Sequence, residues 1–168
     1  MSEAVLDALV AHVKRILPEL QGRVAGFPYL PEPKAIEGRF DKMPYAVVLA
    51  TGMKIEDRQP ADTMHYVSRF TVRRDFDVAL FFDPQVEGQA GSSLLSEDLP
   101  DRLIMHITNW TAACHRFEPL AYEPVLNSSA MSAYALSVAG FITLQPSEFE
   151  PLDPLEAHPL VGIKLEGR

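Results

Sequence analysis

Cys114 and His115 are the Cys/His neighbour pair of this chain, and thiol chemistry is the first reaction class to consider. A catalytic thiol needs a base that faces it and a third group that orients the base. Residues adjacent in sequence rarely face each other, so the pair does not meet that requirement. We expect Cys114 to be a buried, inert thiol.

Metal binding has equally little support. Asp62 and His65 are close enough in sequence to share a metal ion, but no third and fourth ligand follow at the usual spacing. His12 and His106 lie beside the apolar stripes of predicted helices, where packing explains them. The glycine-rich loop at 88–93 lacks the lysine of a phosphate-binding loop. We predict no catalytic, cofactor-binding or metal-binding residue and no enzymatic activity; an enzyme would need a non-local site, best drawn from Asp62, His65, His106 and Cys114.

Composition narrows the classes of partner. The net charge is −8, from 23 acidic and 15 basic residues, which argues against sequence-independent nucleic-acid binding. No stretch approaches the roughly 20 apolar residues of a membrane helix. The start, Met1-Ser2-Glu3, lacks the basic region of a secretory signal. With a single cysteine, the chain suits a reducing cytosol.

Two amphipathic helices are predicted. Over residues 2–20, apolar residues recur in steps of three and four and share one face: Leu6, Leu9, Val13, Ile16 and Leu20. A second helix is predicted over 96–112, with Ser96 as its N-cap. The stretch between 26 and 44 is rich in proline and glycine and reads as a linker.

The strands follow from alternation of apolar and polar residues. We predict a short buried strand at 45–51, a polar connection at 52–63, a long strand at 66–82, a proline-broken edge strand at 116–126 and a strand at 131–145. The long strand would span about 55 Å, whereas a domain of this size is roughly 40 Å across. It must therefore bend near Arg73-Arg74-Asp75 or project as part of a long hairpin.

These elements predict an α+β fold. We expect a mostly antiparallel (mixed) sheet of about four strands with two helices packed on one face. The α+β domain would cover residues 1–145. Residues 146–168, acidic and punctuated by prolines, would form an extended C-terminal arm.

The order of elements resembles the tail-terminator (tail-completion) proteins of bacteriophages, including those of Mu-like prophages. The likeness covers about residues 3–146. It rests on a helix ending Ile16-Leu17-Pro18-Glu19-Leu20, the strand Met43-Pro44-Tyr45-Ala46-Val47-Val48-Leu49, the long strand ending Phe76-Asp77-Val78-Ala79-Leu80-Phe81-Phe82, one helix and a closing strand from Ala133 to Gln145. The resemblance implies a virion protein assembled in the bacterial host cytoplasm. It would form a homo-oligomeric ring, commonly a hexamer, that caps the tail tube, stops its polymerisation and provides the surface for head docking.

That resemblance implies three partners: further copies of this chain, the tail tube protein and head–tail connector proteins. The predicted contact surface is the polar face of the long strand with the preceding connection: Arg69, Arg73, Asp75, Lys54, Asp57 and Arg58. The arm has a second route to a neighbour, strand addition through residues 161–165. Two alternatives stay open: another head–tail joining or neck protein, and a small cytosolic ligand-binding domain.

Overall fold

A computed structural model describes residues 2–37, 40, 42–59, 69–83, 99–127 and 131–144. Its helices are α1 (Ser2–Ile16), the 3-10 helix η1 (Pro18–Leu20), α2 (Pro33–Glu37) and α4 (Leu99–Ile107). Its strands are β1 (Val24–Phe27), β2 (Tyr45–Gln59), β3 (Arg69–Phe82), β4 (Thr111–Ala112), β5 (His115–Asn127) and β6 (Ser132–Leu144). The predicted arm, 146–168, lies outside the described residues.

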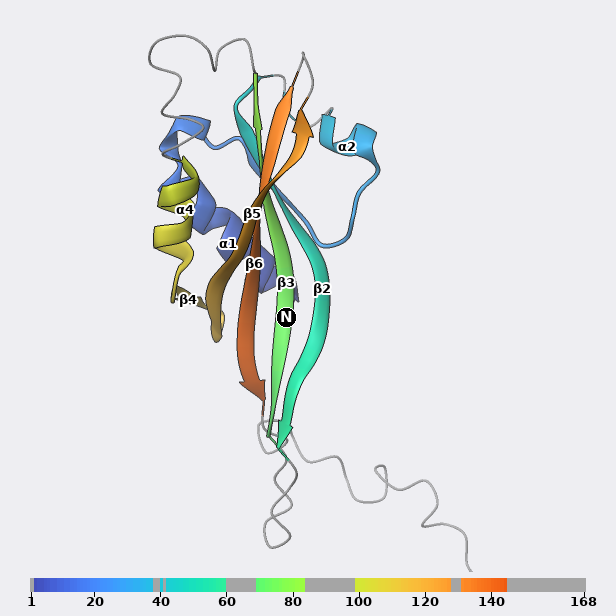
Figure 1. Ribbon diagram of the computed structural model, residues 1–168, viewed down its shortest axis with the longest axis vertical. Helices are drawn as coiled ribbons and strands as arrows, with labels where there is room; N and C mark the ends of the chain where they lie inside the picture. Colours follow the sequence, from blue (N-terminus) through green and yellow to red (C-terminus); the bar gives the residue numbers. More distant parts are fainter. Residues whose placement is uncertain are drawn as a thin grey trace, which may run out of the picture.

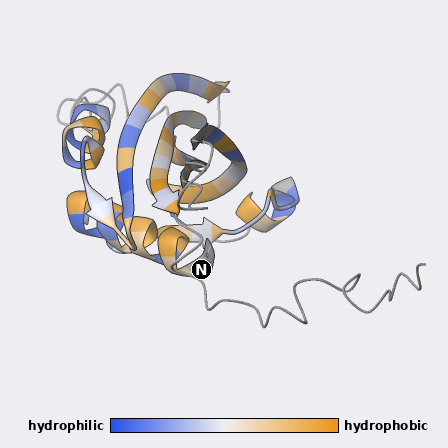
Figure 2. Ribbon diagram, turned by 90° about the horizontal axis from the view of Figure 1, so that it is seen from below, coloured by the Kyte–Doolittle hydropathy of each residue, from blue (hydrophilic) through white to orange (hydrophobic). Residues whose placement is uncertain are grey.

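All the described strands belong to one six-stranded sheet in the order β1-β2-β3-β6-β5-β4. Only β1 and β2 are parallel, and every other neighbouring pair is antiparallel. Strands account for 54% of the described residues, and the sheet is strongly curled, as the view along its strands in Figure 2 shows. The prediction of about four strands and two helices is therefore wrong: β1 and β4 extend the sheet, and η1 and α2 add to α1 and α4.

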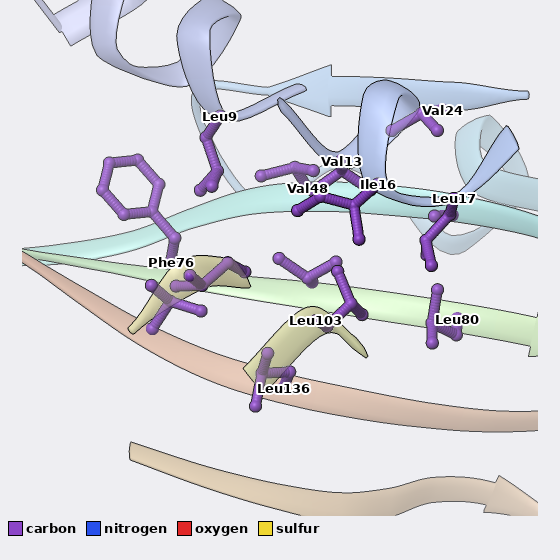
Figure 3. Packing of buried hydrophobic residues seen from close by; sticks show 14 of the residues in the cluster. Leu9, Val13, Ile16, Leu17, Val24, Val48, Phe76, Leu80, Leu103 and Leu136 are labelled. Carbon is purple, nitrogen blue, oxygen red and sulfur yellow. The ribbon is translucent and has the colours of Figure 1, made fainter. Parts of the chain in front are cut away.

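The core lies between one face of this sheet and the helices α1 and α4. Leu9 in α1 and Leu17 just after it point towards β3, where Phe76 and Leu80 meet them (Figure 3). Leu103 of α4 completes this layer. Alternate residues of β3 face this core because side-chain direction reverses at each strand position. The apolar stripe predicted for residues 2–20 is thus the buried face, although the helix breaks at Leu17 because Pro18 follows it.

The N-terminal stretch predicted as a linker contains regular structure. β1 pairs with the first third of β2, from Val24 opposite Ala46 to Phe27 opposite Leu49. Gly26 allows this strand to approach α1, since a Cβ there would lie 2.8 Å from Val10 Cγ2. A four-residue strand within a proline- and glycine-rich segment has too little alternation to be recognised.

The connection predicted at 52–63 is strand up to Gln59, so β2 and β3 form one long hairpin. Two register shifts interrupt the pairing on the β2 side, between Ala50 and Gly52 and between Ile55 and Asp57. The first register shift lies opposite Asp75 and Phe76 of β3, close to the Arg73-Arg74-Asp75 stretch where a bend was predicted. The extra residue, however, belongs to β2 and not to β3. At the hairpin end, β2, β3 and β6 extend past the helices (Figure 1).

Candidate assembly surfaces

The six predicted contact residues all lie on the β2–β3 hairpin. Lys54 is opposite Arg73, Asp57 is opposite Thr71, Arg58 is opposite Phe70, and Arg69 is opposite Gln59. Lys54, Arg73 and Asp75 face away from the helices, on the side opposite Phe76. The side chains of Asp57, Arg58 and Arg69 lie outside the described residues. The structure therefore places all six positions on neighbouring strands, whereas the sequence analysis assigned Lys54, Asp57 and Arg58 to a connection.

The polar face of this hairpin is partly neutralised within the chain. Arg73 Nε donates to Asp75 Oδ1 at 2.6 Å, and its Nη1 lies 3.2 Å from Glu56 Oε1. The Asp75 carboxylate raises the pKa of Arg73. Since both ion pairs are partly exposed, each contributes little to stability. They fix the direction of the Arg73 guanidinium. Within the described part of the hairpin, the neighbouring Lys54 is exposed and forms no ion pair.

His12 is a packed side chain of α1, joined to α4 and to the start of β4. Its ring stacks on Trp110 with centroids 3.8 Å apart, and its Nε2–H donates to the His106 carbonyl at 3.0 Å. Arg15 donates to its Nδ1 at 2.9 Å. This geometry requires the neutral imidazole with its proton on Nε2. Burial lowers the pKa of His12, and the charge of Arg15 lowers it further. The hydrogen bonds account for both ring nitrogens, so His12 serves as a structural group.

Cys114 is exposed, so the prediction of a buried thiol is wrong. The reason is the tight β4–β5 turn: Ala113 and Cys114 both have positive φ, 46° and 63°, which places them at the outer tip. His115 is buried and its Nδ1 bonds to the Ala113 carbonyl at 2.7 Å. Burial lowers the pKa of His115, and the nearby Arg74 adds to this effect.

A hollow of about 560 Å³ lies beside this turn, lined by Thr71, Thr111, Cys114, His115, Arg116, Phe141 and Thr143. Cys114 and His115 both line it, and Nδ1 of the His115 ring is hydrogen-bonded to the Ala113 carbonyl. Across the described ranges, no three His, Cys, Asp or Glu side chains gather as metal ligands, and no helix is long and apolar enough to span a membrane. Asp62, His65 and the loop at 88–93 lie outside the described residues.

Beyond the short strands β1 and β4, the edges of the sheet lie on β2 and β5, and these two edges differ in their backbone chemistry. β5 is the protected edge. Phe117 donates to the Trp110 carbonyl and accepts from Asn109, so its backbone points away from β6. By strand alternation and the pairing register with β6, the backbones of Pro119 and Pro124 point the same way. Each proline removes an N–H from the open side of the edge, and a strand tolerates proline on that side because no ladder hydrogen bond is lost. The missing N–H groups also hinder pairing with a strand of another chain.

Apolar side chains nevertheless project from β5. Register shifts at Pro119/Ala121 and Pro124/Leu126 leave Leu120 and Val125 as the bulged residues. Val125 is 64% exposed, and the adjacent Leu126 is exposed as well. This edge therefore offers apolar side chains but few backbone donors.

The other edge lies on β2, where the part of the strand that does not pair with β1 carries no proline. Ala46 N–H donates to the Arg23 carbonyl on the β1 side. Following the alternation through the register shift at Ala50/Gly52, the backbones of Met53 and Ile55 also point outward, while Gly52 and Lys54 bond to β3. We call the segment Gly52–Arg58 the open β2 edge; no described strand covers its outer side.

Met53 and Ile55 also expose their side chains, by 62% and 68%. Both lie on the helix side of the sheet, opposite Arg74 and Val72. Sequence reasoning missed them, although a signal existed: Met53 and Ile55 alternate with Lys54 and Glu56. The register shift after Ile55 ends this alternation after one repeat, so the sequence of the segment resembles that of a polar loop.

Comparisons with known proteins give no family. No protein-family model matches the sequence, and no curated protein matches it. Among solved structures, a chain from the "Virion of native gene transfer agent (GTA) particle" is similar, with 15% identity and a TM-score of 0.44. The match covers 81% of this chain and 95% of that chain.

Proposed function

We propose that this chain is a structural protein of a phage or prophage virion that forms a ring on the end of a tail tube, as tail terminators do. The observation that carries the proposal is that the two edges of one sheet are unlike. One exposes Met53 and Ile55 with outward backbone groups; the other exposes Leu120, Val125 and Leu126 on a proline-protected strand. A ring needs two different, complementary surfaces on each copy, because like surfaces would close a dimer.

The order of elements supports the same proposal, since it is the pattern that resembles tail terminators. In that role the chain stops tube polymerisation and presents a face to the head–tail connector, and it needs surfaces in place of a catalytic centre. The charge of −8 per copy suits a basic surface on the tube end. Assembly takes place in the host cytoplasm, from copies of this chain, tube subunits and connector proteins.

The first test is the state of assembly. We expect the full-length protein to form a closed ring by native mass spectrometry and light scattering. Added to polymerising tube protein, the ring should bind tube ends and shorten the tubes. A monomer at high micromolar concentration that leaves tube length unchanged would overturn the proposal.

Val125→Lys locates the contact. The substitution places a charge on an exposed bulge, so the fold should be kept while the ring dissociates into smaller species. Met105→Lys is the matched control, because Met105 is 74% exposed and lies on the helix α4 rather than on an edge strand. Equal urea midpoints with loss of the ring in Val125→Lys alone support the β5 contact; a ring unaffected by either change contradicts it.

A further inference from the structure

The open β2 edge has the chemistry of a strand-addition site. It combines outward backbone groups at Met53 and Ile55 with side chains that are more than half exposed. An extended segment added there would gain main-chain hydrogen bonds from the edge and apolar contacts from alternate side chains. β5 is a poorer host for such a segment, because Pro119 and Pro124 each remove an N–H group from its open side.

We propose that residues 161–165 of this chain add as a strand to the open β2 edge. Their sequence, Val-Gly-Ile-Lys-Leu, alternates strictly, so Val161, Ile163 and Leu165 fall on one face of an extended chain. These three side chains continue the apolar row of Met53 and Ile55. Gly162 and Lys164 fall on the face of Lys54.

The position of the last described strand favours this occupant. β6 ends at the same end of the sheet as the open β2 edge (Figure 1). Leu144 is opposite Phe70, and Phe70 is opposite Arg58, so two strand spacings, about 10 Å, separate the end of β6 from β2.

Residues 145–160 connect Leu144 to the proposed strand. Sixteen extended residues reach at most about 55 Å. The segment can therefore come from the same chain or from a neighbouring copy. Both sources present the same chemistry to the edge, and the proposal does not depend on ring formation.

Residue-resolved hydrogen exchange of the full-length protein tests the docking. The amides of Met53 and Ile55 should be protected, and Ile163→Pro, which removes the central N–H of the segment, should speed their exchange by at least ~10-fold. The amides of Gly52 and Lys54 face β3 and serve as internal controls. Leu155→Pro, in the same terminal region but outside the proposed strand, should change neither pair.

Two results overturn the proposal. Met53 and Ile55 amides that exchange as fast as free amides in the unsubstituted chain show that nothing occupies the edge. Protection that persists in Ile163→Pro shows that another segment occupies it. Ile55→Lys provides a second perturbation from the β2 side and should lower protection at Met53, whereas Met105→Lys should not.

A mixing experiment identifies the source of the strand. Isotope-labelled Ile163→Pro chains have an intact edge but cannot supply the segment, and unlabelled unsubstituted chains can. Protection restored at labelled Met53 and Ile55 assigns the strand to a neighbouring copy; protection that stays lost assigns it to the same chain. Native mass spectrometry of the same samples reads ring assembly separately, so failure of the docking and failure of the ring are distinguishable.

Discussion

At Gly26 and Gly140, a core side chain packs directly against the backbone of the glycine. Gly140 on β6 lies opposite Phe117 on β5, and the fully buried Phe117 ring covers it. A Cβ at this position would lie 3.0 Å from Phe117 Cε1 and 3.3 Å from Cδ1. The glycine is thus required by the aromatic ring packed over it, which no alternation pattern in the sequence reveals.

Gly140→Ala should therefore destabilise the protein. The Phe117 ring would have to shift within a filled core, at a cost of about 1–3 kcal/mol. Gly52→Ala is the matched control, because the nearest atom to its Cβ would be Asp75 Oδ2 at 3.9 Å, and we expect a change within about 0.5 kcal/mol. Urea unfolding followed by circular dichroism measures both. Equal effects of the two substitutions would contradict the role of Phe117.

At the scale of elements, a strand can be predicted from the sequence where one of its faces is buried, because burial produces the alternation of apolar and polar residues. β3 and β6 alternate over many residues because one face packs against α1 and α4, and both strands were predicted from that alternation. Positions 66–68 and 145 of the predicted strands lie outside the described residues. The second half of β2 was missed because the described side chains from Gly52 to Glu56 are exposed on both faces, so no burial pattern marks this stretch. Likewise, the packing of His12 was foreseen from its place on the helix, but not its stacking on Trp110, which depends on a contact 98 positions away.

The prolines of β5 make a prediction about this element. Pro119→Val with Pro124→Val restores two outward N–H groups on an edge that already exposes Leu120 and Val125. We expect the double variant to associate progressively with concentration and to form β-rich aggregates, because an unprotected apolar edge templates further strands. Light scattering and thioflavin fluorescence measure this.

Pro31→Val provides the control, since the same change is made in the segment between β1 and α2, away from the β5 edge. It should leave the association state unchanged. A double variant that stays as dispersed as the unsubstituted protein would show that Pro119 and Pro124 do not protect the edge.

At the scale of the whole molecule, two buried histidines link stability to pH. His12 of α1 is hydrogen-bonded to the His106 carbonyl of α4, and His115 is the first residue of β5. Burial lowers the pKa of each below its ordinary value, with Arg15 beside His12 and Arg74 beside His115 acting in the same direction. The fold therefore favours both imidazoles in their neutral form.

The sign of the pH dependence follows from that preference. The unfolded chain takes up protons on these histidines as the pH falls below about 6.5, while the folded chain resists protonation until lower pH. Their contribution to the free energy of unfolding is complete above about pH 6.5 and is lost progressively below it. Urea unfolding at pH 7.5 and pH 5.5 should show the decrease, and NMR titration should place both imidazole pKa values below 6.5. Arg15→Gln removes a cation beside His12, so it should raise the pKa of His12 and leave that of His115 unchanged; a lowered or unaltered His12 pKa in this variant would contradict the assignment.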